Sequence, residues 1–164
     1  MECCGVAGCR GRGNPNLFRR ASSGWAAWGT LAFSAIARRA CAALGYNECV
    51  SYSFIDQASA ALFGGGTDDT RLENPISNDM SHMRPSLLPA LLQAAARNQA
   101  RGFPDMALFE VGPVFTGGEP GDQHLQISGL LTGSTGPKDV HGASRPVDVF
   151  DVKADIEAVL SAIG

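Results

Sequence analysis

Apolar residues return at helical spacing in several parts of this chain. Over 31–44, 86–101 and 151–163 they gather on one side of a helix, so each segment predicts an amphipathic helix. A shorter helix is predicted over 57–63, because Asp56 can cap it and three successive glycines follow it. The chain is therefore expected to contain helices separated by segments of another type.

The ends and buried faces of these helices can be predicted too. Gly45 lies where a left-handed residue would end the first helix, and Ser86 and Asp151 are the expected N-caps of the last two. Pro89 fits the first turn of its helix, and Arg38 falls off the apolar stripe of the first. The residues expected to face the core are Phe33, Ile36, Ala37, Ala40, Ala43 and Leu44, then Leu87, Leu88, Leu91, Leu92 and Ala95, and finally Val152, Ile156, Val159, Leu160 and Ile163.

Four segments are predicted as strands, the first of them because apolar and polar residues alternate along it. The segments concerned are 48–55, 105–115, 124–133 and a short one at 147–150. Gly112-Pro113 is expected to break or turn the second of them. In the first, the residues that would share one face are Val50, Tyr52 and Phe54. Helices interleaved with mostly hairpin-connected strands favour an α+β fold with an antiparallel or mixed sheet.

Composition limits the class of protein. A chain of 164 residues with 45% hydrophobic and 18% charged residues can bury one core. Its net charge of −3 gives no basic face, so RNA contact by this segment is not indicated. Residues 1–30 lack any apolar period and predict a poorly ordered leader. Without a spanning apolar run or a secretory signal, no membrane partner is expected, and the expected location is cytoplasmic.

Cysteine and histidine spacing argues against a metal site. Of the five cysteines, three fall within Cys3–Cys9, but the paired spacing of a zinc site is missing. We expect free thiols in a reducing compartment. His82, His124 and His141 are too widely spaced to predict a metal triad or a catalytic base.

Three aspartates near the C-terminus offer a second possibility for cation binding. Asp148, Asp151 and Asp155 could be cation ligands. Asp151, however, fits a helix cap, and Asp155 fits the first helical turn, where the helix dipole favours carboxylates. The structural interpretation is the stronger one.

The stretch 74–102 joins a polar loop to an amphipathic helix. Arg84 lies at the mouth of this helix and precedes a proline, which favours extended backbone. Its guanidinium could bind Glu110, in an otherwise apolar strand, as a structural strut, or it could grip a phosphate; the residues themselves leave both open. Asn98 falls within the apolar stripe, and a buried amide needs partners, so we expect it to bond to a neighbouring loop or strand.

Four stretches of the chain, taken in order, resemble one known family. They are "LGYNECVSYSF", "NPISNDMSHMRPSLLPALLQAAARNQARG", "ALFEVGPVF" and "VDVFDVKADIEAVL". From about Leu31 to Gly164 the chain resembles the beta subunit of bacterial phenylalanyl-tRNA synthetase, in its catalytic-like class II module. The resemblance implies an antiparallel or mixed sheet flanked by helices. Residues 1–30 match nothing that precedes this module, and the family's other domains are not recognisable, so we expect an incomplete fragment.

The resemblance implies roles for individual segments. The helix 31–44 and the strand 48–55 look like the elements that class II synthetases use for subunit contact. The structural and interface candidates are therefore Tyr46, Glu48, Tyr52 and Phe54, together with Arg84, Asn98 and Glu110.

The resemblance also implies that catalytic residues are missing. "LFEVGPVF" looks like the first strand of the second class II motif, which in active sites leads into Phe-Arg-x-Glu, whose arginine holds the ATP α-phosphate. Here the matching run is Phe115-Thr116-Gly117-Gly118. The third, glycine-rich motif with its arginine is not found either. A site without these charges cannot stabilise a reacting triphosphate, so no catalytic, cofactor or metal residue is expected here.

The function implied by the resemblance is that of a scaffold within a larger enzyme. The module would dock to a catalytic alpha subunit in an (αβ)2 assembly. That assembly would use ATP and Mg²⁺ to charge tRNA with phenylalanine, and tRNA would be bound through other parts of the complex. The alternative is a free-standing synthetase-like paralogue that binds a partner protein. An independent enzyme is disfavoured by the missing arginines.

Overall fold

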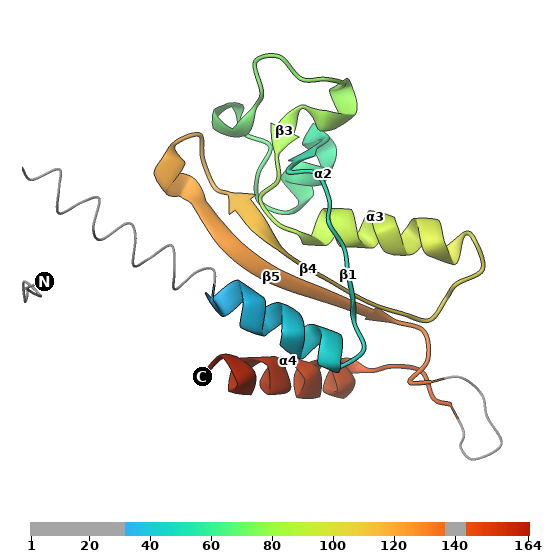
Figure 1. Cartoon of the computed structure of the whole chain (residues 1–164). Coiled ribbons are helices and arrows are strands. Elements are labelled where there is room, and N and C mark those ends of the chain that lie inside the picture. The colour runs from blue at the N-terminus through green and yellow to red at the C-terminus, as the bar shows by residue number, and fades with distance from the viewer. Residues whose placement is uncertain (1–31, 137–143) are drawn as a thin grey trace, which may run out of the picture. The chain divides into compact units, whose positions relative to one another are not determined.

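The fold is built on a three-stranded mixed sheet (Figure 1). In this computed structural model, β1 (Asn47–Glu48) is parallel to β4 (Met106–Phe115). β4 pairs along its whole length with the antiparallel β5 (Gln123–Thr132). The predicted α+β class with a mixed sheet is confirmed.

The structure describes residues 32–136 and 144–164. The leader predicted over 1–30 lies outside these residues. By its contacts, Ser34–Gly164 forms one compact unit. No helix within the described ranges is long and apolar enough to cross a bilayer.

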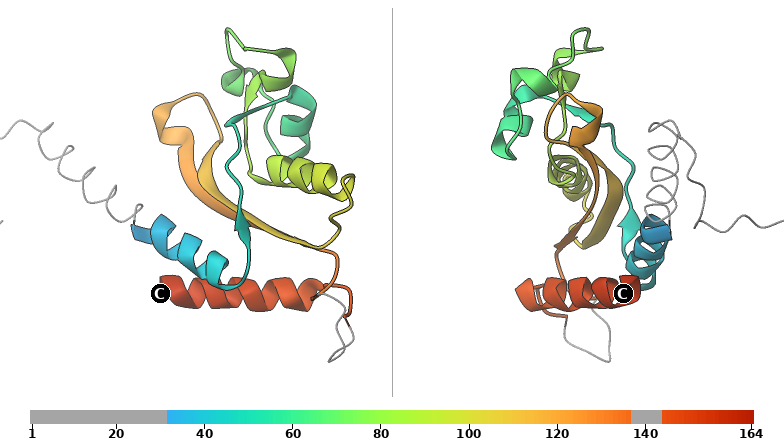
Figure 2. Two further views of the ribbon diagram at one scale, coloured as in Figure 1. Left: turned by 45° about the vertical axis from the view of Figure 1, so that its right-hand side comes forward. Right: turned by 90° about the vertical axis from the view of Figure 1, so that its left-hand side faces the viewer.

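Helices cover both faces of the sheet (Figure 2). The first helix (residues 32–43) and α4 (Val149–Ile163) lie on one face, where Cys41, Phe109, Val111 and Val159 form a buried cluster. On the other face α3 (Leu88–Gln99) buries Leu91 and Ala95 against Leu108. Successive residues of β4 thus point to opposite faces, as the pleat of a strand requires.

A smaller layer lies beyond the end of the sheet. It pairs β2 (Phe54–Ile55) with β3 (His82–Met83) and includes α2 (Gln57–Leu62). The predicted cap of α2 is confirmed, because an Asp56 carboxylate oxygen accepts a 2.8 Å hydrogen bond from the Ser59 backbone N–H. Three short 3-10 turns complete the described elements: η1 (Asp68–Thr70), η2 (Asn78–Met80) and η3 (Pro120–Asp122).

The single strand predicted over 48–55 is wrong. The chain forms β1, leaves the edge of β4 after Cys49 donates to Phe109 O at 2.7 Å, and forms β2 only at Phe54. Val50 and Tyr52 are 90% and 72% exposed. Apolar and polar residues therefore alternate through a segment in which neither Val50 nor Tyr52 is buried.

The expected break at Gly112-Pro113 is also wrong, because β4 continues to Phe115. The backbone oxygens of Phe109 and Pro113 accept bonds from groups outside the β4–β5 pair, so these alternate residues turn their polar groups away from β5. A backbone N–H at position 113 would also point away from β5. The missing N–H of Pro113 therefore costs the β4–β5 pair no hydrogen bond. This is the situation in which a strand tolerates proline.

The helix faces differ in part from those predicted. In the first helix the buried residues are Ser34, Ala37 and Cys41, so the buried face is rotated from the predicted stripe. Gly45 does take the predicted left-handed conformation, with φ of 87°. In α3, Leu92 is 45% exposed, although it was expected in the core.

The C-terminal segment also departs from the prediction. No strand forms at 147–150, because α4 begins at Val149. Asp148 is the N-cap, and Asp151 completes a capping box with it. Val159 is buried as predicted, whereas Ile156 and Leu160 are 53% and 60% exposed.

Candidate functional site

Arg84 is the largest side chain buried in the described part of the chain, with 1% of its surface exposed. Its backbone N–H donates to Ser53 O at 2.9 Å, and its backbone O accepts from Phe115 N at 3.0 Å. Arg84 therefore connects the segment before β2 with the end of β4. Extended backbone before Pro85 allows both bonds.

The guanidinium of Arg84 bonds to two segments, β4 and the residues before β2. Nη1 donates to Glu110 Oε1 at 2.7 Å and to Ser51 Oγ at 2.8 Å, while Nε donates to Pro113 O at 2.9 Å. Ser51 in turn donates to Glu110 Oε2 at 2.7 Å. Of the two possibilities that the sequence left open for Arg84, the structure contains the contact with Glu110, with the two side chains 2% and 4% exposed.

This pair neutralises two charges inside the protein. A buried carboxylate is tolerated when an opposite charge and hydrogen bonds surround it, and Glu110 has both. The guanidinium is buried and already bonded, so this geometry supports the strut and leaves no open face for a phosphate.

Gly112 makes room for the guanidinium. A Cβ at this position would lie 2.5 Å from Arg84 Nη2, which is closer than nonbonded atoms approach. Sequence reasoning interpreted this glycine as a strand break and missed its steric role. The available signal was the spacing of Glu110 and Gly112, because residues two apart in a strand lie on the same face.

Two further candidates from the sequence also pair across elements. Tyr46 donates a 2.7 Å hydrogen bond to Asp155 Oδ2 on α4. Burial, together with that bond, raises the pKa of the Tyr46 hydroxyl well above its ordinary value. Glu48 accepts from Arg38 Nε at 2.7 Å, and Arg38 also donates to Val111 O at 3.1 Å.

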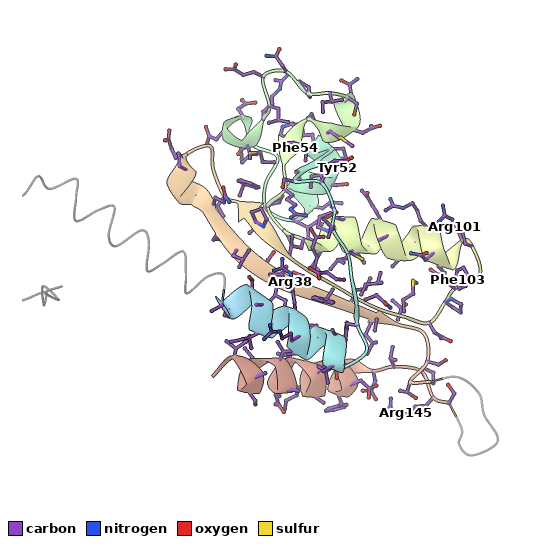
Figure 3. All side chains as sticks on the ribbon, in the orientation of Figure 1. Arg38, Tyr52, Phe54, Arg101, Phe103 and Arg145 are labelled. Atoms are coloured by element: carbon purple, nitrogen blue, oxygen red, sulfur yellow. The ribbon has the colours of Figure 1, made fainter. Side chains whose placement is uncertain are left out.

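Arg38 is thus a residue that sequence reasoning missed, since it lay off the predicted stripe. Figure 3 shows it beside the sheet, whereas Tyr52 and Phe54 lie near α2 and β3. Tyr52 is exposed, and Phe54 is half-buried in β2. Neither of these two aromatic side chains belongs to the hydrogen-bond network of Arg84.

The expected partner of Asn98 is corrected by the structure. Its amide donates at 2.9 Å to Ala94 O, one turn earlier in the same helix, and not to a neighbouring loop or strand. The residue is only half-buried. A polar side chain can satisfy itself in this way on its own helix.

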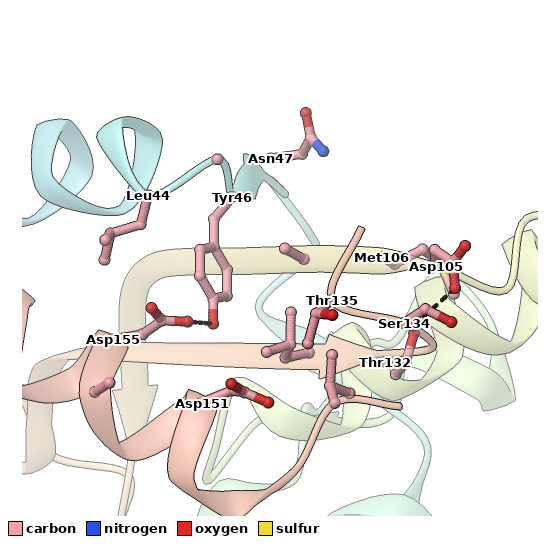
Figure 4. Close-up of a pocket in the computed structure, with 15 residues that line it drawn as sticks. Leu44, Tyr46, Asn47, Asp105, Met106, Thr132, Ser134, Thr135, Asp151 and Asp155 are labelled. Carbon is pink, nitrogen blue, oxygen red and sulfur yellow. Dashed lines mark hydrogen bonds between the residues drawn. The ribbon is translucent and has the colours of Figure 1, made fainter. Parts of the chain in front are cut away.

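A cleft of about 500 Å³ opens near the start of β4 and the first turns of α4 (Figure 4). Its acidic residues already have partners. Asp105 accepts from Ser134 N at 2.8 Å, and Asp155 accepts from Tyr46. These hydrogen bonds account for the positions of the two carboxylates, so no cation is needed to explain why they lie here.

The aspartates of α4 act as caps and ion-pair partners. Asp148 accepts from Phe150 N at 2.8 Å, and Asp151 accepts two short bonds from Arg145. The Arg145 guanidinium and the Asp148 backbone lower the pKa of Asp151 to about 2. Within the part of the chain that the structure describes, no group of three or more His, Cys, Asp or Glu residues could hold a metal ion. Asp155 lies beyond the first turn in which it was expected.

The turn between β4 and β5 carries only negative charge. Residues 116–122 include Glu119 and Asp122 and no lysine or arginine. These two residues form a capping box on η3, in which Glu119 N donates to Asp122 Oδ2 at 3.1 Å. Both carboxylates of this turn thus serve a local capping role.

Comparisons with known proteins identify the family. The family model of the phenylalanyl tRNA synthetase beta chain CLM domain matches residues 29–164. The chain is 77% identical over 129 residues to the phenylalanine--tRNA ligase beta subunit of Ruegeria pomeroyi, covering 79% of this chain and 16% of that relative. For the same subunit of Cereibacter sphaeroides the identity is 69% over 128 residues, covering 78% of this chain and 16% of the relative.

The fold has relatives among solved structures. It resembles a histidine--tRNA ligase subunit of Alicyclobacillus acidocaldarius with a TM-score of 0.58, at 17% identity, over 98% of this chain and 44% of that one. The chain spans 16% of the length of the beta subunits that it matches. The match over 29–164 shows that this chain belongs to the family of the phenylalanyl tRNA synthetase beta chain CLM domain.

Proposed function

We propose that this segment is a non-catalytic scaffold and interface module of a phenylalanine--tRNA ligase beta subunit. In this proposal it adopts a class II synthetase-like fold and docks the catalytic alpha subunit in an (αβ)2 assembly in the cytoplasm. The assembly uses ATP and Mg²⁺ to attach phenylalanine to tRNA, which it contacts through other parts. The observation that carries the proposal is the burial of Arg84 against Glu110, next to a β4–β5 turn that contains no lysine or arginine.

The pairing of the described arginines that bond to β4 supports the proposed non-catalytic role. A reacting triphosphate needs cations that are free to follow its developing charge. The two guanidinium groups that bond to β4 belong to Arg38 and Arg84, and each is paired with a glutamate. The hairpin that follows offers Glu119 and Asp122.

Exposed apolar side chains support the docking role. Val50 and Tyr52, in the segment between β1 and β2, are 90% and 72% exposed. Phe150 and Leu160 on α4 are 73% and 60% exposed. Tyrosine and other large apolar groups that are exposed in this way are enriched in protein interfaces.

The test is co-expression of the chain with the alpha subunit of the same organism, followed by size-exclusion chromatography with light scattering. We expect a stoichiometric complex. Val50→Ser combined with Tyr52→Ser is expected to weaken it, whereas Ile76→Ser, at a position that is also 90% exposed, is the matched control. A monomer that ignores the alpha subunit would favour the free-standing paralogue. ATP turnover by the isolated chain would contradict the non-catalytic role.

A further inference from the structure

The smaller layer of the fold contains a second cleft, of about 330 Å³. It lies between the start of α2, the η2 turn and β3, in the green part of Figure 1. The residues that line it all have polar side chains: Gln57, Arg71, Asn78, Ser81 and His82. None of these residues takes part in the Arg84 network or lines the cleft of Figure 4.

His82 is an unusual member of this lining, because only 3% of its surface is exposed. Its Nδ1 is 2.9 Å from Ser81 Oγ, but its Nε2 is buried and has no hydrogen-bond partner among residues 32–136 and 144–164. A buried polar atom left in this state destabilises the fold, so a ligand that bonds to it would recover free energy. His82 is held in place by its backbone, which pairs with Ile55 and forms a bridge with Arg71.

Arg71 brings a positive charge to the same cleft. Its side chain is exposed, and its guanidinium forms no hydrogen bond or ion pair with another described residue. Asp68 and Glu73 share a neighbouring hollow with Arg71. Neither carboxylate lines the cleft around His82, so the charge of Arg71 is available on that side.

The donors around the cleft indicate the class of ligand. Arg71 offers several N–H groups, and the amides of Gln57 and Asn78 offer more. If Ser81 donates to Nδ1 of His82, Nε2 carries the proton and becomes a donor as well. With one histidine and no carboxylate in the lining, a metal ion would find too few ligands.

We propose that this cleft binds a phosphate group, with Arg71 supplying the charge and His82 Nε2 a hydrogen bond. A phosphate oxygen accepts several such bonds at once, and arginine matches its geometry. Gln57 and Arg71 are long, exposed side chains, which change rotamer readily and can admit the ligand to the buried nitrogen. The phosphate comes either from the free ion or from a nucleotide.

The proposal is tested by NMR of the imidazole groups in the full 164-residue chain, titrated with inorganic phosphate and separately with AMP at constant ionic strength. The resonance that is missing in His82→Gln identifies His82. We expect it to shift saturably, with a midpoint of roughly 1 mM. His124 on β5 provides an internal reference that should not shift.

Matched arginine variants decide the outcome. Arg71→Gln is expected to raise the midpoint about tenfold, which corresponds to the loss of one charge-assisted contact. Arg101→Gln, an exposed arginine outside the cleft, should leave the midpoint unchanged. Tighter binding of AMP than of phosphate would identify a nucleotide as the source. Lack of saturation with either probe, or equal midpoints in the two variants, would overturn the proposal.

Discussion

Removal of the buried guanidinium tests the strut directly. Arg84→Ala deletes hydrogen bonds to Glu110, Ser51 and Pro113 and leaves a carboxylate that is 3% exposed. Ser51 still donates to Glu110, so the carboxylate keeps hydrogen bonds but loses its opposite charge. Breaking a buried pair in this way costs about 3–5 kcal/mol, against roughly 5–15 kcal/mol for a whole domain. The expected fall in Tm is therefore roughly 6–20 °C.

The free energy of unfolding is measured by urea titration followed by circular dichroism. Lys153→Ala is the control, because it removes a pair with Glu157 in which the side chains are 68% and 66% exposed. Its effect should stay below about 1 kcal/mol. The double variant Arg84→Met with Glu110→Leu should be less destabilised than Arg84→Ala, because it leaves no unpaired charge in the interior.

Two results would refute this reasoning. One is an Arg84→Ala variant as stable as Lys153→Ala. The other is a double variant that is less stable than Arg84→Ala alone, which would mean that the unpaired carboxylate is not the cause. Unchanged stability combined with a loss of ATP binding would instead assign Arg84 to a ligand site.

Three further variants probe other contacts in the fold. Gly112→Ala should cost about 1–3 kcal/mol in urea unfolding, because the added methyl group collides with Arg84; an unchanged midpoint would show that the strand yields. Tyr46→Phe removes a bond to an aspartate of α4 and should cost about 1–2 kcal/mol in the same assay. Asp151 has its pKa lowered to about 2 by Arg145. Its stabilisation is thus present above the ordinary pKa of 3.8 and lost as pH falls toward 2, so Asp151→Asn should lower Tm at neutral pH and remove that acid-dependent loss.

The long elements could be predicted because burial decides their faces over many residues. β4 and β5 span ten residues each, most residues of β4 are buried, and α3 follows a helical period over twelve. The ends of two helices could be predicted as well, because each depends on contacts between residues close together in the sequence. Asp56 caps α2 and Gly45 ends the first helix as expected, since both effects involve residues within one turn.

The segment 48–55 could not be predicted because its outcome depends on a distant strand edge. Beyond Phe109, that edge of β4 is bonded by side chains. Arg38 donates to Val111 O and Arg84 donates to Pro113 O. These two guanidinium groups thus bond to the backbone oxygens that a longer strand over 48–55 would have used. The sequence of residues 48–55 itself gives no sign of this.

The site itself was partly predictable for the same reason. A glutamate in an apolar strand and an arginine before a proline each required a partner, so Arg84 and Glu110 could be matched by charge. Their third partner, Ser51, and the space at Gly112 depend on tertiary packing. The rotation of the first helix, which brings Arg38 to the sheet, depends on the same packing.

The arginine side chains that bond to β4 connect the fold to the proposed function. A phosphate-binding arginine needs free donors, yet Arg38 and Arg84 each donate to a backbone oxygen and to a glutamate of this chain. These bonds agree with the proposed role, in which the two arginines support β4 and bind no nucleotide. Near β1 the chain exposes apolar surface, at Val50 and Tyr52. Apolar surface binds protein better than it binds phosphate, which supports docking as the role of this part of the fold.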